Sequence, residues 1–351
     1  MKKRLSPEVF NLPVEQLKQG IFSDSYFIRT RDILQKDNHH PIVIMQVFQR
    51  QDAILCGIDE ALAILKCGSY HPERLKIKAL FDGDPIEPWE TVMTIEGDLA
   101  DFVHLETVYL GSLSRQTKVA TNVNRVVKAA SEKPVLFFPS RFDHYSVQAI
   151  DGYAAHIGGV SGVSTPANGQ FWGAKALGTI PHALIATYHG NTVAATNAFD
   201  RHIDPSVNRV ALVDFDNDCV KTALEVAREL GSKLYAVRLD TADTLVDYSV
   251  VPCMGNFKPT GVCAQLVHNV RSALDQNGFN HVRILVSGGF TAEKIAQFES
   301  LKVPVDVYAV GSSLFNNNIN FTADVVIVDG KPGAKIGREY RENPRLQPVI
   351  L

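Results

Sequence analysis

From about residue 119 onward, strand-like apolar runs alternate with helical segments. The runs are VLFFPS (135–140), HALIAT (182–187), RVALVDF (209–215), KLYAVRLD (233–240), VRILVSGG (282–289) and VDVYAVGSS (305–313). Most are apolar on both faces and close on Gly, Ser, Asp or Arg, as buried strands of parallel sheets do. Repeated β-α units of this length predict a barrel or a doubly wound sheet.

The segments between these runs carry helical signals. Val220, Ala223, Leu224, Ala227 and Leu230 follow an i, i+3, i+4, i+7 spacing, and Gly231 ends the pattern. Thr291 is a candidate N-cap for a helix that contains Ile295 and Phe298. Each strand-like run is therefore expected to be followed by a helix that covers the sheet.

The first third of the chain has a different rhythm. PIVIMQVF (41–48) and TVMTIEG (91–97) are strand-like, DEALAIL (59–65) is helical, and turn residues separate them. Short strands between turns predict an antiparallel or mixed sheet. A further strand, DVVIVDG (324–330), precedes a basic tail that is expected to return to this first part.

The length of 351 residues favours two domains. We expect a mixed α/β N-terminal domain at 1–118, completed by 324–351, and a catalytic α/β barrel at 119–323. The net charge of −3 gives no overall basic field for nucleic acid or an acidic membrane. Five cysteines form no CxxC pair, and no apolar run approaches the roughly 20 residues of a membrane span. We therefore expect a soluble, cytoplasmic protein that binds neither nucleic acid nor membrane.

Polar residues gather where the predicted strands end, which is where parallel α/β folds place their sites. These ends are Ser140-Arg141, Asp214, Arg238 to Thr241, Ser287-Gly288-Gly289 and Gly311-Ser312-Ser313. The last two offer bare backbone N–H groups, and each is expected to open a helix, so they suit a phosphate monoester. The alternative is that glycine there only permits tight turns.

Arg238 and Asp240 lie two residues apart, so an extended strand end would point both side chains to one face. The arginine can clamp phosphate or carboxylate, and the aspartate can bind ribose hydroxyls or Mg²⁺ carried by pyrophosphate. A simple ion pair is the alternative. His182 follows Gly178-Thr179 and Pro181, and a lone histidine there is more often structural than catalytic.

Several common devices are missing from the sequence. It contains no GxxxxGK[ST] phosphate loop, no GxGxxG after a strand, no GxSxG elbow and no zinc spacing of His, Cys and Asp. ATP bound through a P-loop, dinucleotide cofactors and serine hydrolysis therefore lose their main support.

Taken together, these motifs resemble the nicotinate phosphoribosyltransferase family, especially its shorter archaeal-type branch. The resemblance covers about residues 20–330. The matching segments are FSDSYFIRT, ETVYLGSLSRQTKVAT, the stretch from SRFDHYSVQ to GVSGVST, GTIPHALIA, LVDFDND, VRLDTAD, VSGGF and YAVGSSL. GTIPHALIA is close to the family's G-T-x-x-H motif. Each segment is weak alone, and their order carries the resemblance.

The resemblance implies a fold and a reaction. The fold would be an incomplete α/β barrel, of the type II phosphoribosyltransferase kind, beside a mixed α/β domain built from both chain ends. The reaction would join nicotinate to phosphoribosyl pyrophosphate, with Mg²⁺ as cofactor and ATP as co-substrate, in NAD biosynthesis. Homo-oligomers with shared active sites are expected, in which Tyr26 stacks on the pyridine of the neighbouring subunit.

The resemblance also implies residue roles. His182 would be transiently phosphorylated, and Arg238 and Asp240 would hold pyrophosphate, ribose and Mg²⁺, with Asp240 as the metal ligand. Arg141 would face the nicotinate carboxylate or the phosphates. The remaining residues expected to bind substrate are His144, Thr179, Asp214, Ser287, Gly288, Gly289, Gly311 and Ser312.

Some features depart from the family. The chain has no cysteine after Cys263, so no zinc knuckle is expected near its C-terminus. The arginine loop, Ser140 to His144, holds one arginine where relatives have two, which leaves nicotinamide or another pyridine as alternatives. A non-catalytic phosphosugar-binding relative also stays open. A barrel aldolase or isomerase would need a lysine at a strand end, and none is present.

Overall fold

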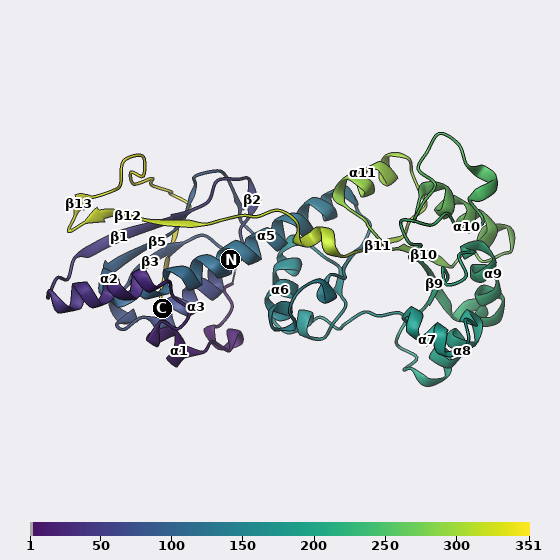
Figure 1. The fold of residues 1–351 in the computed structure, drawn as a ribbon, viewed down its shortest axis with the longest axis horizontal. Coiled ribbons are helices and arrows are strands. Elements are labelled where there is room, and N and C mark those ends of the chain that lie inside the picture. Colours follow the sequence, from purple (N-terminus) through teal and green to yellow (C-terminus); the bar gives the residue numbers. More distant parts are fainter. Residues whose placement is uncertain (1–2) are drawn as a thin grey trace. The chain divides into compact units, whose positions relative to one another are not determined.

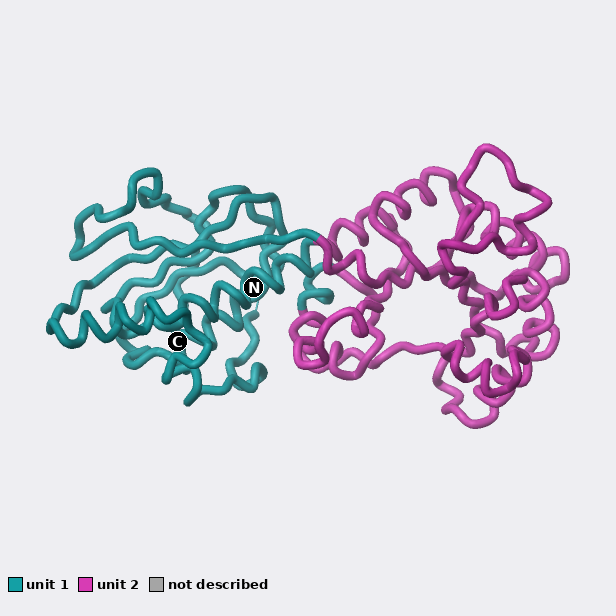
Figure 2. The backbone as a smooth tube through the Cα atoms, in the orientation of Figure 1, with its two compact units in different colours: residues 1–121, 154–158, 317–351 teal, residues 122–153, 159–316 magenta. Residues whose placement is uncertain are grey.

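The computed structural model describes residues 3–351, and these divide into two compact units (Figure 2). Unit 1 contains the residues up to 121 together with 154–158 and 317–351. Unit 2 contains 122–153 and 159–316. No helix of the described residues has both the length and the apolar character needed to cross a membrane.

Unit 1 is built on an antiparallel sheet of six strands in the order β13-β12-β1-β5-β3-β14. Its strands are β1 (Ile42–Phe48), β3 (Lys76–Ala79), β5 (Thr91–Asp98), β12 (Thr322–Val328), β13 (Lys331–Pro332) and β14 (Gln347–Val349). Strands β2 (Ala53–Ile54) and β4 (Pro85–Ile86) form a separate pair. The predicted C-terminal return is confirmed, since Val43 on β1 pairs with Val328 on β12.

Helices accompany this sheet. They are α1 (Val14–Gln19), α2 (Ser25–Lys36), α3 (Ile58–Gly68), α4 (Leu99–Phe102) and the long α5 (Glu106–Ala129), whose last turns belong to unit 2. One face of α3 joins the core, where Ile58, Leu62 and Leu65 pack with apolar strand residues. The unit therefore folds around its own hydrophobic core.

Unit 2 is a parallel sheet whose order, β7-β6-β11-β10-β9-β8, repeats the chain order around a ring with one break. Its strands are β6 (Val135–Phe137), β7 (Gly162–Val163), β8 (Arg209–Leu212), β9 (Leu234–Leu239), β10 (Arg283–Val286) and β11 (Val307–Val310). Strands β7 and β8 do not pair, and the segment between them makes one isolated bridge, Val163 to Ala176. The predicted incomplete barrel beside a mixed α/β domain is confirmed.

Helices follow the strands around the outside of this sheet (Figure 1). They are α6 (Gln148–Gly158), whose residues 154–158 belong to unit 1, α7 (His182–Thr187), α8 (Thr192–His202), α9 (Cys219–Leu230), α10 (Ala264–Gln276) and α11 (Ala292–Ser300). The expected signals hold: Gly231 ends α9 with φ +55°, and the Thr291 side chain accepts from the Lys294 N–H at the start of α11.

One predicted strand is wrong. Residues 182–187 form helix α7, and only Ile185 of this run is buried. Alanine and leucine favour helix, and a run that buries one side chain in six does not behave as a doubly buried strand. Its place in the ring is taken by β7, which at two residues is too short to stand out as an apolar run.

Candidate active site

A cavity of about 480 Å³ lies where the strands of unit 2 reach their carboxyl ends, and we call it the carboxyl-edge cavity. Its lining is Phe138, Ser140, Arg141, Phe142, Ser164, Thr165, Pro181, His182, Leu212, Arg238, Asp240, Ser287, Gly288, Gly289, Phe290, Ala309, Gly311 and Ser312. The carboxyl ends of parallel strands converge on one edge of a sheet. Segments more than 170 residues apart in the chain therefore share one cavity.

Arg238 and Asp240 form the centre of a bonded cluster. Arg238 Nη2 lies 3.2 Å from Asp240 Oδ2, and Arg238 Nε donates to Ser287 Oγ at 2.8 Å. Ser287 Oγ in turn donates to Asp240 Oδ1 at 2.6 Å. Arg238 Nη1 donates to Thr179 Oγ1 at 3.2 Å, and the guanidinium lies 5.7 Å from the Phe138 ring centre. These contacts fix the guanidinium plane, a requirement for binding phosphate in a defined orientation.

His182 is held by a carboxylate from the next strand end. Its Nε2 lies 3.0 Å from each oxygen of Asp214, and its Nδ1 makes no hydrogen bond within residues 3–351. The Asp214 side chain is 7% exposed while that of His182 is 46% exposed. Burial raises the pKa of Asp214, the nearby His182 opposes this, and Asp240 adds to it. The imidazole is thus oriented by a buried acid and keeps its other nitrogen available.

The two glycine corners require glycine for different reasons, the first for its backbone conformation and the second for close packing. Gly288 and Gly289 have φ values of +82° and +67°, in the left-handed region that side chains disfavour. Gly311 has φ −112°, but a Cβ there would lie 3.0 Å from the Phe142 ring. The first corner leads into α11 as expected. The second leads only into a 3₁₀ turn, Ser312–Phe315, so the expectation of a full helix there was wrong.

Arg141 lies in a short 3₁₀ turn, Ser140–Phe142, with its guanidinium 5.2 Å from the Phe142 ring centre. It forms no ion pair with any residue of the described chain. Ser140 beside it is anchored, because its Oγ donates to Asn168 Oδ1 at 2.7 Å and lies 3.1 Å from Ser164 Oγ. Arg141 is therefore a cation at the cavity wall with capacity for a ligand anion.

Four of the predicted residues do not line this cavity. Tyr26 is on α2 of unit 1, 57% exposed, with its hydroxyl 3.1 Å from Asp24 Oδ2. His144 is exposed, pairs with Ser146 at 2.7 Å and does not line the cavity. Thr179 lines a different cavity and reaches this one only through its bond to Arg238. Asp214 is joined to the cavity through His182.

The sequence reasoning missed the aromatic and hydroxyl part of the lining. Phe138, Phe142 and Phe290 give the cavity flat apolar walls, and Ser164 and Thr165 follow β7. Their signal was the GVST run directly after that short strand. Had residues 162–163 been recognised as a strand, Ser164 and Thr165 would have been candidates as another polar strand end.

The one acidic side chain that lines the cavity, Asp240, would fit a Mg²⁺ ion whose other ligands came mainly from a bound phosphate compound and water. Asp240 offers one partly exposed carboxylate beside a phosphate-compatible arginine. Within residues 3–351, no group of three or more His, Cys, Asp or Glu side chains is arranged to hold an ion by itself. One carboxylate combined with phosphate oxygens and water is a common Mg²⁺ environment.

Comparison with known families gives two matches that together cover most of the chain. The profile of the quinolinate phosphoribosyl transferase N-terminal domain matches residues 24–117, and that of the C-terminal domain matches residues 119–320.

Individual relatives point to related enzymes. The nicotinate phosphoribosyltransferase pncB1 of Mycobacterium tuberculosis is 28% identical over 271 residues, which are 75% of this chain and 56% of that protein. The nicotinate phosphoribosyltransferase of Bacillus subtilis is 26% identical over 66% of this chain and 44% of its own length. The chain thus spans about half the length of these curated relatives.

Among solved structures, nicotinate-nucleotide pyrophosphorylase from Pyrococcus furiosus is similar with a TM-score of 0.81 and 35% identity, covering 95% of this chain and 84% of that one. Human nicotinic acid phosphoribosyltransferase shares the fold, with a TM-score of 0.67 at 17% identity over 89% of this chain and 76% of that one.

Proposed function

The chain belongs to the quinolinate phosphoribosyl transferase family, and on that premise we propose that it makes nicotinate mononucleotide. In the proposed reaction, nicotinate attacks phosphoribosyl pyrophosphate and pyrophosphate is released, a step of NAD biosynthesis. The Mycobacterium relative is named for nicotinate as the transferred base, which supports this pyridine. The name of the Pyrococcus relative refers to the nicotinate nucleotide, which both nicotinate and quinolinate would give. One observation carries the proposal: the Arg238–Asp240 pair, His182 and two glycine corners line a single cavity.

The cavity residues match the charges of the donor substrate. The backbone N–H groups of Gly288, Gly289 and Ser312 would bind the 5′-phosphate, since glycine lets the backbone approach oxygen atoms closely. Arg238 would bind the pyrophosphate. Asp240 would accept hydrogen bonds from ribose hydroxyls and contribute a carboxylate to Mg²⁺, which when bound would supply positive charge to the pyrophosphate.

In the reaction, the bond between ribose C1 and the pyrophosphate oxygen breaks, and its electron pair leaves with pyrophosphate. The lone pair of the pyridine nitrogen forms the new bond to C1. Arg238 is pre-positioned by Ser287, Thr179 and Asp240, so it would stabilise the departing charge without rearranging. The aromatic walls of the cavity would hold the pyridine ring in line with C1.

Quinolinate, after which the family is named, is a second candidate substrate. The number of available cations in the cavity favours nicotinate over it. Quinolinate carries two carboxylates, and forming the same mononucleotide from it would release one as CO₂. Of the two arginines in the cavity, Arg238 already pairs with Asp240, whereas Arg141 has no carboxylate partner in the described chain. One available guanidinium suits one substrate carboxylate.

A product assay tests the proposal. The protein is incubated with phosphoribosyl pyrophosphate, Mg²⁺ and nicotinate, nicotinamide or quinolinate, with and without ATP, and the mononucleotide and CO₂ are measured. We expect nicotinate to give the highest kcat/KM. Faster turnover of quinolinate with CO₂ release would replace nicotinate by the second candidate, and binding of the donor without any product would make the chain a sensor.

His182 is proposed to couple ATP to the reaction. Asp214 holds Nε2 and leaves Nδ1 available, so the imidazole could accept a phosphoryl group from ATP and later lose it to water. In His182→Asn we expect ATP hydrolysis to vanish while some ATP-independent synthesis survives. His189→Asn, at an exposed position outside the cavity lining, is the control. Unchanged ATP hydrolysis in the first variant would refute the role.

Tyr26 is proposed to complete the active site of a second subunit. Its exposed aromatic ring on α2 is suited to stacking on a pyridine. The test mixes two inactive variants, Tyr26→Ala and Arg141→Ala, after dissociation and reassembly. If dimers share their sites, the equimolar mixture regains about a quarter of the wild-type activity, because about half of the dimers are mixed and each mixed dimer has one intact site of two. No recovery from oligomers shown to be mixed would place both residues in the site of the same chain.

A further inference from the structure

A second cavity of about 320 Å³ lies at the opposite, amino-terminal edge of the parallel sheet, and we call it the amino-edge cavity. Its lining is Pro134, Leu136, Phe138, Ser161, Lys175, Ala176, Leu177, Gly178, Thr179, Ser206, Val207, Asn208, Val210, Tyr235, Arg283, Leu285 and Val307. Residues 175–179 belong to the segment between β7 and β8, the two strands that do not pair with each other. The cavity therefore lies beside the break in the barrel.

The lining combines apolar walls with positive charge. Leu136, Leu285 and Val307 belong to the cluster inside the barrel, and Leu177 contributes from the connecting segment. Two cations are present and no Asp or Glu is among the lining residues. A volume of about 320 Å³ is near the lower end of cavities that hold small organic ligands. An anionic molecule with an apolar body matches this lining.

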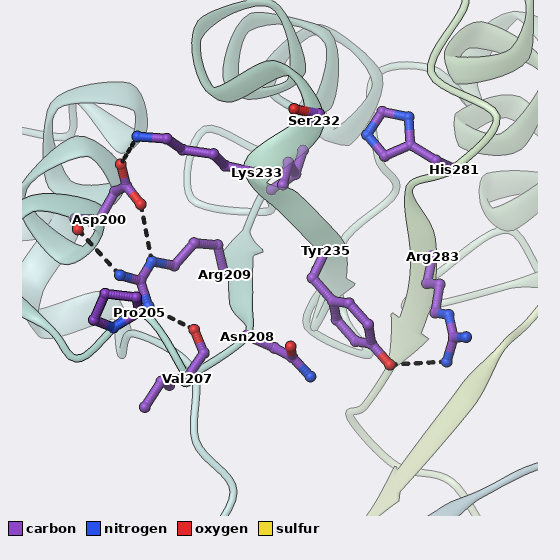
Figure 3. A pocket seen from close by; sticks show the side chains of 11 residues that line it. Asp200, Pro205, Val207, Asn208, Arg209, Ser232, Lys233, Tyr235, His281 and Arg283 are labelled. Atoms are coloured by element: carbon purple, nitrogen blue, oxygen red, sulfur yellow. Dashed lines mark hydrogen bonds and ion pairs between the residues drawn. The ribbon is translucent and has the colours of Figure 1, made fainter.

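Arg283, at the start of β10, supplies the better defined cation. Its Nη1 donates to the Tyr235 hydroxyl at 2.8 Å, and its guanidinium lies 5.0 Å from the Tyr235 ring centre (Figure 3). In the described chain it has no ion pair, and the second cation, Lys175, has none either. Tyr235 thus restrains a guanidinium plane whose other donors carry no protein carboxylate, the arrangement that binds a ligand carboxylate with two parallel bonds.

The neighbouring cations already share a protein carboxylate. A polar groove shares Val207, Asn208, Tyr235 and Arg283 with the cavity (Figure 3). In that groove Asp200 pairs with Lys233 at 2.8 Å and with Arg209 at 3.0 Å. Arg283 stands apart from this ion-pair network. Positive charge that the protein leaves uncompensated next to an apolar cavity is what an anionic ligand can use.

We infer that the amino-edge cavity is a binding site for an aromatic carboxylate, a flat ring that carries one acidic group. The ring packs between the aliphatic wall and Tyr235, while Arg283 and Lys175 bind the carboxylate. The free aromatic acid and its mononucleotide share this chemistry. Gly178 is the one glycine among the residues that line this cavity, so a two-corner phosphate site is absent from its lining and the carboxylate is the group recognised.

Such a ligand would act on the reaction through Thr179. This residue lines the amino-edge cavity, and its Oγ1 accepts a hydrogen bond from Arg238 in the carboxyl-edge cavity. Phe138 lines both cavities, with Arg238 above its ring. A ligand that shifts the Thr179 segment therefore changes the support of Arg238. By linkage, phosphoribosyl pyrophosphate would change the affinity for the ligand by the same factor.

The test uses 4-fluorobenzoate, which lacks a ring nitrogen and cannot be converted, and follows its binding to the full chain by ¹⁹F NMR. We expect two bound equivalents in the wild type. Arg283→Met should weaken one of them about tenfold, as expected for one charged contact. Lys175→Gln, on an exposed segment, should weaken the same equivalent less. Arg228→Met, an exposed arginine on α9, is the matched control and should change neither.

Several outcomes overturn the inference: no equivalent sensitive to Arg283→Met in a folded variant, or displacement of that equivalent by inorganic phosphate as readily as by benzoate. Displacement of the bound 4-fluorobenzoate by nicotinate mononucleotide would support the inference, and it would show that the mononucleotide also binds at this site.

The variant Arg141→Met separates this inference from the proposed function. If it removes no equivalent, the proposed pyridine site fails while the Arg283-dependent site stands. Coupling predicts that saturating the Arg283 site changes the Kd of phosphoribosyl pyrophosphate at least threefold in the wild type but not in Arg283→Met.

Discussion

The two edges of the parallel sheet in unit 2 use the same residue types for different purposes. At the carboxyl edge, Arg238 is held by three side chains in a cavity and keeps donors for a ligand. At the amino edge, the Arg209 side chain is 6% exposed, and its donors are used within the protein. They donate to the Asp200 carboxylate and to backbone carbonyls of residues 200–207. The capacity to bind a ligand therefore follows from which hydrogen-bond donors the fold leaves unused.

The carboxylates differ in the same way. At the carboxyl edge, burial raises the pKa of Asp214. At the amino edge, the hydrogen bond from Lys233 and then that from Arg209 lower the pKa of Asp200. Burial works against the charged form of Asp214, whereas two neighbouring cations stabilise the charged form of Asp200.

The largest effect is expected from Arg238→Met. Loss of a fixed guanidinium beside the leaving group removes transition-state stabilisation, so kcat/KM should fall by about 10³-fold. Thermal unfolding should change by only a few degrees, because Asp240 keeps its bond from Ser287. Steady-state kinetics and calorimetry on the same preparation measure both. Activity within tenfold of wild type would show that the carboxyl-edge arginine is structural.

Arg209→Met makes the opposite prediction. It leaves Asp200 with Lys233 alone and removes the donor from several backbone carbonyls, so the free energy of unfolding should fall by about 3 kcal/mol. The folded fraction should keep the wild-type kcat. Urea titrations measure the stability, and kinetics at low temperature measure the turnover. A large loss of kcat in the folded variant would contradict the division between edges.

Glycine offers a matched pair with a smaller effect. Gly289 and Gly278 have φ values of +67° and +82°, and an added Cβ would meet nothing within 4 Å at either. Alanine at either position should cost about 1 kcal/mol of stability through its left-handed backbone. Only Gly289→Ala should also raise the KM for phosphoribosyl pyrophosphate, about five- to tenfold. An equal rise in Gly278→Ala would remove the link between corner and phosphate.

The smallest effect is a difference in titration. Because the pKa of Asp214 is raised, its ionised form costs stability in full above its folded pKa. That cost shrinks as pH falls through the folded pKa and is gone below the unfolded pKa. Asp200 has a lowered pKa, so it contributes stability that is lost only as pH falls through that lower value. On acidification Asp214 should therefore protonate first and release His182, and ATP coupling should decline before the fold weakens.

Carboxyl ¹³C NMR of labelled aspartate, assigned with Asp214→Asn and Asp200→Asn, follows both groups in one sample. The reverse order of protonation would contradict the contrast between the edges.

Much of the fold could be predicted because burial leaves a periodic trace. Strands β8 to β11 are apolar on both faces, and α9 repeats its apolar residues at helical spacing. The failures also have a physical basis. Residues 182–187 were apolar by composition but bury one side chain, and β7 is a two-residue strand without a period.

The chain alone determined which polar residues stand at strand ends, because a buried strand must be apolar and its end is where polarity returns. The sequence could not determine which of these side chains form hydrogen bonds with one another. The contacts of Arg238 with Ser287 and Thr179 span 49 and 59 residues, and that of His182 with Asp214 spans 32. Such pairings depend on strand order and on the break beside β7. Only the tertiary structure therefore decided which arginines are left free to bind a ligand.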